Sequence, residues 1–369
     1  MFQLRYQVWI LILGLLLALV LAVSSVKAGE GPVSWSENQT AEGPVLVNPG
    51  FECSQGFGSQ LGIDGSVPLG WTGLLLDGRP ELDSSRVRYT GQCGDGGFVE
   101  RIEGLDSLVM VSEDIETPPH PGKPFDALVY QRTSVLAGTA YSLSSWMVSL
   151  CGGSAIPNDC PDGYYMSKML GIDPTGGVDP EASSVVWIED LRNFTESGWA
   201  NLRLGTTAQE DHLTIFARIR SPFRWHGAHA FLDAISLVRS PTAHFVGLPA
   251  LVDGNQVTVG WNGSQSPDIA AIPGGTYELL YDIQVREDGA DSWTDWLVSR
   301  PAGEALFTAA GSCGFHRYQF RLRARSEQPP GSNGAWPNHR YPGDWSQPAT
   351  VIFLNDMPPV PRVFLPLIN

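Results

Sequence analysis

The stretch Phe125–Ser149, FDALVYQRTSVLAGTAYSLSSWMVS, holds two runs typical of β-strands, joined by a short turn. Residues 127–135 are rich in Val, Leu and Tyr, residues 136–139 supply the turn, and residues 140–149 alternate in polarity. In the second run one face carries Tyr141, Leu143, Ser145 and Met147, and the other carries Ser142, Ser144, Trp146 and Val148. This alternation predicts a half-buried strand: one face packs on a core, and the other meets a ligand or a second layer.

The same stretch resembles the middle hairpin of the galactose-binding-like jelly rolls, a group that includes carbohydrate-binding modules of families 4, 9 and 22. The resemblance rests on Tyr130-Gln131 followed by Ala137-Gly138-Thr139-Ala140-Tyr141-Ser142-Leu143-Ser144-Ser145-Trp146. Upstream, residues 46–52 (LVNPGFE) and then Gly70-Trp71 resemble the first strand of these modules, and residues 230–237 (AFLDAISL) resemble the closing strand. The resemblance implies a jelly-roll β-sandwich over residues 44–240.

From Pro241 onward the pattern resembles a fibronectin type III domain, predicted for residues 241–353. It consists of residues 257–261 (VTVGW), 281–286 (YDIQVR), 316–325 (HRYQFRLRAR) and 344–346 (DWS), in that order. The family implies that Trp261 packs in the core and that Tyr318 makes the tyrosine-corner hydrogen bond. The expected fold class is therefore all-β: a jelly roll followed by an immunoglobulin-like sandwich.

Both ends of the chain differ from these domains. An apolar run at residues 8–23 follows Arg5 and ends before a small-residue site at Ala28, which predicts a secretory signal over residues 1–28; an uncleaved anchor is the alternative. Residues 29–43 are expected to be a flexible lead, and residues 354–369 a Pro-rich tail. For the tail, docking on the last domain and a sorting role both stay open. We therefore expect a secreted or envelope-associated protein.

Composition limits the partners. The chain has a net charge of −16, and removal of the predicted signal takes away Arg5 and Lys27 but no acidic residue. So acidic a surface repels phosphate backbones, which argues against nucleic acid as a partner. The 41 glycines and 28 prolines favour many turns and short strands over long helices.

The cysteines predict disulfides, as expected in an exported protein. Cys151 and Cys160 bracket a short Gly/Pro loop and are expected to pair, which leaves Cys53 to pair with Cys93. Zinc is the alternative, but no close Cys/His spacing is present. Cys313 stands alone in the second domain.

The jelly-roll resemblance implies a structural calcium ion at the corner where the first and last strands end. Glu52 and Asp233 are the candidate ligands, with Asp95 as an addition, because calcium accepts hard oxygen ligands from separate strands. The alternative is that Glu52 caps backbone amides and Asp233 points to solvent.

Glycan binding requires aromatic rings that stack on a sugar face, surrounded by hydrogen-bonding groups. Trp146 is the preferred candidate, with Tyr130 and Gln131 beside it and Tyr164 and Tyr165 in a loop. Three other tryptophans lie further along the chain from this group: Trp187, Trp199 and Trp225. For each of these residues a role in the core is the alternative.

The sequence lacks the signatures of common enzymes. It contains no Gly-x-Ser-x-Gly elbow, His-Glu-x-x-His helix or phosphate-binding Gly-rich loop with Lys. The pair His226 and His229 is more simply explained as strand-edge histidines. A glycosidase carboxylate pair among Glu103, Asp106, Glu113, Asp114 and Glu116 is the weaker alternative, because proximity of carboxylates is expected in an acidic chain.

A stripe of arginines on residues 316–325 leaves two interpretations open. Arg317, Arg321, Arg323 and Arg325 lie opposite the apolar Tyr318, Phe320, Leu322 and Ala324. They form either a polyanion site or cross-strand ion pairs with acidic residues such as Asp282 or Glu278.

Together the sequence predicts a secreted, non-catalytic protein. Its jelly roll is expected to recognise an extracellular polysaccharide or glycan, and its second domain to act as a spacer or to contact cell-surface proteins. The alternative, from another class, is a surface structural or adhesion protein that binds no sugar.

Overall fold

The structure is a computed structural model of the full chain, and it describes nine ranges of residues: 43–93, 101–112, 123–151, 166–192, 198–222, 228–270, 276–310, 314–329 and 340–355. Gly43–Asn369 forms one compact unit. The predicted signal, nearly all of the lead and nearly all of the tail lie outside the described residues. Among the described residues, no helix has the length and apolar character needed to cross a membrane.

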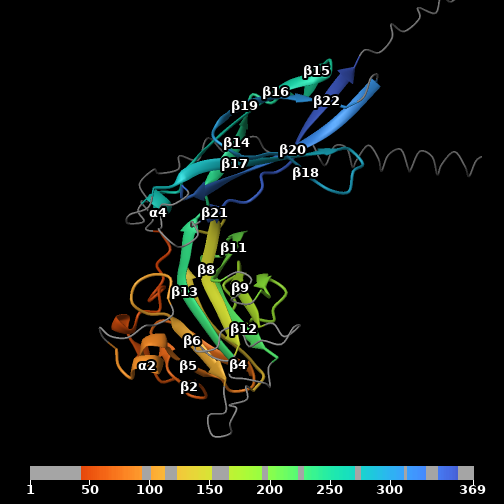
Figure 1. Ribbon diagram of the computed structural model, residues 1–369. Helices are drawn as coiled ribbons and strands as arrows, with labels where there is room; N and C mark the ends of the chain where they lie inside the picture. The colour runs from red at the N-terminus through yellow and green to blue at the C-terminus, as the bar shows by residue number, and fades with distance from the viewer. Residues whose placement is uncertain are drawn as a thin grey trace, which may run out of the picture. The chain divides into compact units, whose positions relative to one another are not determined.

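The described part of the chain is almost entirely β-structure, and the chain up to Arg239 forms a jelly-roll sandwich (Figure 1). Its five-stranded sheet has the order β10-β9-β12-β7-β4. Its six-stranded sheet has the order β11-β8-β13-β6-β5-β2. The strands are β2 Asp64–Gly65, β4 Thr72–Asp77, β5 Glu81–Ser84, β6 Leu108–Ser112, β7 Phe125–Ser134, β8 Ala140–Cys151, β9 Ser167–Asp173, β10 Val186–Asp190, β11 Ala200–Thr207, β12 His212–Ser221 and β13 Ala228–Arg239. The all-β fold class predicted from the sequence is confirmed.

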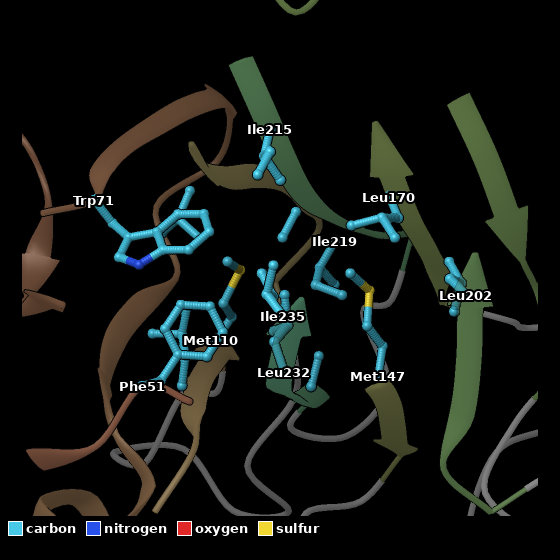
Figure 2. Close-up of a cluster of buried hydrophobic side chains, with 14 of the residues drawn as sticks. Phe51, Trp71, Met110, Met147, Leu170, Leu202, Ile215, Ile219, Leu232 and Ile235 are labelled. Carbon is cyan, nitrogen blue, oxygen red and sulfur yellow. The ribbon is translucent and has the colours of Figure 1, made fainter. Parts of the chain in front are cut away.

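Apolar side chains from both sheets fill the space between them, and Figure 2 shows part of this core. The predicted period-2 faces of β8 are confirmed, because its alternate side chains enter the core while their neighbours face away, and β12 alternates in the same way. The core-facing residues of these two strands include Tyr141, Leu143, Met147, Leu213, Ile215, Ala217 and Ile219.

The opening stretch is not a hairpin in the structure. β7 pairs with β12 and β4, whereas β8 pairs with β11 and β13, so the turn between them crosses from one sheet to the other. Gly138 supports this turn with φ +76°, and the Thr139 amide donates to the Leu136 carbonyl at 3.1 Å. Local alternation predicted the two strands, but their partners are distant in sequence.

Short elements cover the start of this sandwich. They are the 3₁₀ turn η1 Cys53–Gln55, the two-stranded pair β1 Phe57–Gly58 and β3 Val67–Pro68, and the helix α2 Ser85–Thr90. Ser84 caps α2, because its Oγ accepts from the Val87 amide, and Gly91 ends the helix in the left-handed region. The predicted disulfide Cys53–Cys93 is present, with 5.7 Å between its Cα atoms. The side chain of Cys151, together with Cys160 and Cys313, lies outside the described residues.

The chain after Ser240 forms a second set of sheets. A three-stranded sheet has the order β14-β16-β19, and a larger one has the order β15-β22-β20-β17-β18 with β21 paired to β20. The elements are β14 Thr242–Val246, β15 Leu251–Asp253, β16 Gln256–Ser264, α4 Pro267–Ala270, β17 Glu278–Glu287, β18 Thr294–Arg300, β19 Gly303–Thr308, β20 Gly314–Glu327, β21 Arg340–Pro342 and β22 Ala349–Asn355. Trp261 is buried in the core, and the hydroxyl oxygen of Tyr318 accepts from the Ala310 amide at 3.1 Å. Both contacts agree with the roles predicted for these residues.

Candidate functional site

A row of residues crosses the outer face of the five-stranded sheet. Strand register places Trp187 beside Gly171, Gly171 beside Phe216, Phe216 beside Tyr130 and Tyr130 beside Thr72. Paired residues in a sheet project from the same face, so this row is continuous across all five strands. On β9 and β12 the neighbouring residues, Leu170, Ile172, Ile215 and Ala217, face the core instead.

The rings in this row are in contact. The ring centroids of Tyr130 and Phe216 lie 5.8 Å apart, and those of Trp187 and Phe216 lie 5.7 Å apart, both pairs tilted. These spacings fall within the range at which aromatic pairs attract. Phe216 is fully buried, whereas Tyr130 and Trp187 are half-buried. The row therefore presents two partly open rings on a buried aromatic base, which we call the aromatic row.

Gly171 sets the position of Trp187. A Cβ atom at position 171 would lie 2.6 Å from ring carbons of Trp187, which is closer than such atoms approach. The indole therefore lies directly over the backbone of β9. A glycine inside a strand is often the sign of such a close approach.

Charged groups lie beside the aromatic row. The guanidinium carbon of Arg218 is 5.8 Å from the centroid of the Trp187 ring. Arg218 donates to both oxygens of Asp126 at 2.7 Å and to Glu181 at 2.9 Å. Hydrogen bonding to Asp126 raises the pKa of Arg218 from its ordinary value, against the effect of burial. The cation is thus fixed by two carboxylates that retain further lone pairs for hydroxyl donors.

Trp146, the preferred sequence candidate, does not lie in this row. It is 1% exposed on the outer face of the six-stranded sheet, where it belongs to a cluster with Trp199 and Phe231. So deeply buried an indole offers no ring face to a sugar. Of the two roles expected for this face of β8, a second layer is the one observed: Ser142, for example, donates to the Pro342 carbonyl.

Of the remaining candidates for glycan binding, Tyr130 lies on the outer face of the sheet and Gln131 does not. Tyr130 belongs to the aromatic row, but its neighbour Gln131 points the other way and is 5% exposed. The amide group of Gln131 accepts from Val47 at 2.8 Å and donates to the carbonyls of Val47 and Gly70, both at 3.0 Å. Gln131 therefore holds the start of the domain in place. Tyr164 and Tyr165 lie outside the described residues.

The two predicted metal ligands, Glu52 and Asp233, both hold the backbone of residues 102–105. The carboxylate of Asp233 accepts from the amides of Ile102 at 2.6 Å, Glu103 at 3.0 Å and Ala234 at 2.6 Å. Both oxygens of Glu52 accept from the Leu105 amide at 3.0 Å. No group of three potential metal-ligating side chains occurs among the described residues. Asp95 lies outside the described residues.

Burial dominates the electrostatics of this corner. It raises the pKa of Asp233 well above its ordinary value, against the opposing effect of the three amide donors. Burial and then the charge of Glu52 raise the pKa of Glu103, and burial also raises the pKa of Glu52. Each group is costly to ionise where it stands.

Of the five carboxylates considered for a glycosidase pair, the structure describes Glu103 and Asp106. Asp106 is 1% exposed and accepts from the hydroxyls of Ser84 at 2.6 Å and Ser85 at 2.7 Å and from the Arg86 amide at 2.8 Å. It thereby anchors the first turn of α2. Glu113, Asp114, Glu116 and His226 lie outside the described residues, and His229 is buried on β13.

Comparisons with known proteins give likenesses in structure only. No family model matches the chain, and no curated protein matches its sequence. A family 61 carbohydrate-binding module solved with β-1,4-galactotriose is 14% identical, over 53% of this chain and 97% of the module, with a TM-score of 0.33.

Two further solved structures are similar at a comparable level. A family 4 carbohydrate-binding module is 12% identical over 47% of this chain and 96% of its own, with a TM-score of 0.26. The adhesin domain of Epf from Streptococcus pyogenes is 9% identical over 82% and 91%, with a TM-score of 0.24. At these values the likenesses decide nothing about a ligand.

From the sequence, Trp187 was only a secondary candidate for glycan binding, and Phe216 was not a candidate at all. The available signals were Trp187 inside a short strand-like run and Gly171 inside another. Only the register of β10, β9, β12 and β7 brings these residues together with Tyr130. That register depends on pairings between segments far apart in the chain.

Proposed function

We propose that the protein is a secreted, non-catalytic glycan-binding protein and that its jelly roll binds sugar at the aromatic row. The observation that carries this proposal is the pair of half-buried rings, Tyr130 and Trp187, seated on the buried ring of Phe216. A sugar ring has an apolar face of C–H groups that packs against an aromatic ring. Because Phe216 and the Gly171 backbone already fix the two rings, little side-chain entropy is lost on binding.

The flanking polar groups would provide orientation. The carboxylates of Asp126 and Glu181, held by Arg218, accept hydrogen bonds from sugar hydroxyls. The exposed guanidinium groups of Arg132 and Arg220 lie on the outer face of β7 and β12 and donate to hydroxyl or ring oxygens. This combination of a ring platform with convergent polar groups is typical of small-molecule sites.

The rest of the chain would place this site outside the cell. The Cys53–Cys93 disulfide supports an oxidising compartment. We assign the second set of sheets to the fibronectin type III type, as a spacer or contact module, on the basis of the buried Trp261 and the Tyr318–Ala310 hydrogen bond. A calcium ion at Glu52 and Asp233 fits less well, because three backbone amides already use the lone pairs of Asp233.

Affinity electrophoresis of the mature chain, in gels that contain soluble plant, fungal or bacterial polysaccharides, tests the proposal. We expect one polysaccharide class to retard the wild type, Trp187→Ala to remove the retardation, and Tyr130→Ala to weaken it. Tyr89→Ala is the matched control, since Tyr89 is an aromatic residue, 37% exposed, that contacts the opposite sheet of the sandwich. Parallel gels with calcium and with a chelator test the calcium site.

Unretarded migration of the folded wild type in every gel would overturn the proposal and favour the adhesion or structural role. Retardation that is equal in the wild type and Trp187→Ala would place the glycan site elsewhere on the chain.

A further inference from the structure

A cavity of about 320 Å³ lies within the compact unit, at the outer face of β11. Four arginines line it: Arg203 from β11, Arg323 and Arg325 from β20, and Arg340 at the start of β21. Its volume is near the lower end of the range for ligand pockets, enough for one sugar-sized group. So many cations around one cavity are unexpected in a chain whose net charge is −16.

Only two carboxylates pair with these arginines among the described residues. Asp282 lies 3.1 Å from Arg323 and 3.2 Å from Arg325, so the cross-strand pairing predicted for the arginine stripe is confirmed for both. Glu327 lies 3.2 Å from Arg325 and 2.6 Å from Arg340. The four guanidinium groups therefore retain an excess of two positive charges.

Arg203 is the cation without a carboxylate. Within the described part of the chain it makes no ion pair, although it is half-buried. Burial and then the charges of Arg340 and Arg325 lower its pKa to about 10, with Glu327 opposing, so it is still protonated at neutral pH. A charge in such surroundings is destabilising until an anion joins it.

A neutral group on the cavity wall also lacks a partner. Asn201 donates through Nδ2 to the Ser145 carbonyl at 3.3 Å, but its buried Oδ1 accepts no hydrogen bond. A buried acceptor of this kind is costly unless a donor reaches it. Arg203 thus requires an oxyanion and the Oδ1 of Asn201 requires a hydroxyl or N–H donor. Both residues line the same cavity, and a ligand there reaches the buried Oδ1 once the Asn201 side chain turns toward it.

We propose that this cavity binds an acidic sugar residue, with its carboxylate or sulfate on Arg203 and Arg340 and one of its hydroxyls on Asn201. A simple anion without a hydrogen-bond donor would pair with Arg203 but leave the Oδ1 of Asn201 without a partner. A neutral sugar would leave the excess positive charge of the arginines unpaired. Arg325, paired with both carboxylates, holds the other side in place. Ile188 and Pro342 supply apolar surface for the C–H groups of the sugar. This site is separate from the aromatic row.

Isothermal titration calorimetry of the mature chain at low ionic strength tests this second site. The probes are oligogalacturonate and glucose 6-sulfate, which separate the carboxylate from the sulfate source, with glucose, sodium sulfate and polyglutamate as comparisons. We expect at least one acidic sugar to bind and Arg203→Gln to weaken its binding by about tenfold, the value of one charged hydrogen bond. Arg203→Lys should retain part of the affinity, because it keeps the charge.

The matched control is Arg317→Gln on the same strand β20, whose guanidinium lies 3.5 Å from Asp288, away from the cavity. This variant and Trp187→Ala should bind the acidic sugar within about twofold of the wild type, which separates this inference from the proposed function. Arg203→Gln should keep or raise the melting temperature, because it removes an unpaired buried charge.

Three results would overturn the proposal. The first is absence of binding by both acidic sugars. The second is equal binding of sodium sulfate or polyglutamate, which would indicate a general anion site or an acidic peptide site. The third is unchanged affinity in Arg203→Gln.

Discussion

The two outer faces of the jelly roll differ in what lies over them. On the five-stranded sheet, Tyr130 and Trp187 are half-buried and present part of their rings. On the six-stranded sheet, Trp146 is 1% exposed and Trp199 is 4% exposed. Each face carries tryptophan on a strand that alternates in polarity, yet of these described tryptophans only Trp187, on the first face, keeps part of its surface exposed.

The cover on the six-stranded sheet comes from segments remote in the sequence. Ile102 packs on the cluster of Trp146 and Phe231, and Asp233 holds the Ile102 amide. Tyr89 of α2 lies over Phe231, with ring centroids 6.0 Å apart. A strand's own pattern shows which side chains share a face, and distant segments decide whether that face is open.

Trp146→Ala should produce the largest effect on stability. Removing a fully buried Trp leaves a cavity and costs about 3–5 kcal/mol of the free energy of unfolding. Trp187→Ala, from the half-buried row, should cost about 1 kcal/mol. Urea unfolding of both variants checks the contrast, and similar losses in the two would contradict the assignment of covered and open faces.

The disulfide should contribute almost as much to the free energy of unfolding as Trp146 does. Its structural effect should be confined to the covered face of the six-stranded sheet. Cys53 and Cys93 close a loop that contains α2, with a sequence separation of 40. Replacing both by Ser should cost about 4 kcal/mol by loop entropy and loosen the cover over Trp146. Acrylamide quenching of tryptophan fluorescence and thermal unfolding measure these effects. The glycan affinity of the folded variant should not change, and a loss of affinity would couple the two faces.

A smaller effect is expected from Gly171→Ala on the open face. The added Cβ would clash with the Trp187 ring, and overpacking of this kind costs about 1–3 kcal/mol. We expect Trp187 to shift and polysaccharide retardation to weaken. Gly58→Ala is the control, since its nearest contact would be an ordinary 3.5 Å from Leu69. Full retardation in Gly171→Ala would show that the position of Trp187 is unimportant.

The smallest effect is a pH dependence on the covered side. Burial raises the pKa of Asp233, so the folded state binds more protons than the unfolded state above the ordinary pKa. The contribution of Asp233 to the free energy of unfolding is therefore absent above the raised pKa, increases as the pH falls through it, and is complete below the ordinary value. Asp233→Asn removes this contribution.

Melting temperatures from about pH 7 to about pH 4 measure the effect. The difference between the wild type and Asp233→Asn should grow in favour of the wild type as the pH falls. Asp77→Asn, at an exposed carboxylate, should run parallel to the wild type. If the difference in melting temperature between the wild type and Asp233→Asn stays constant over this pH range, the raised pKa of Asp233 is wrong.

Part of the fold was predictable because apolar and polar residues alternate along its strands. The strands β7 and β8 follow from local alternation, and β13 was predicted from the jelly-roll resemblance. The roles of Trp261 and Tyr318 were implied by the fibronectin type III resemblance, and the Cys53–Cys93 pair was the one left after Cys151 was assigned to Cys160. The hairpin predicted between β7 and β8 was wrong, since a turn does not show whether the chain stays in one sheet.

The site was predictable only in part. Tyr130 was identified, whereas Trp146 was chosen over Trp187 because the sequence does not show what covers a strand. The order β10-β9-β12-β7 joins residues up to 86 positions apart, from 130 to 216, and only that order forms the aromatic row. Gly171 was the one local sign of a ring lying on the backbone.

Hydroxyl-radical footprinting shows directly whether a bound polysaccharide covers the aromatic row. The mature chain is oxidised with and without the polysaccharide that retards it in gels, and the modified residues are mapped by mass spectrometry. Binding at the aromatic row should protect Tyr130 and Trp187 from oxidation and leave Tyr89, on the opposite sheet, unchanged. Protection of Tyr89 with Tyr130 and Trp187 still oxidised would contradict binding at the aromatic row.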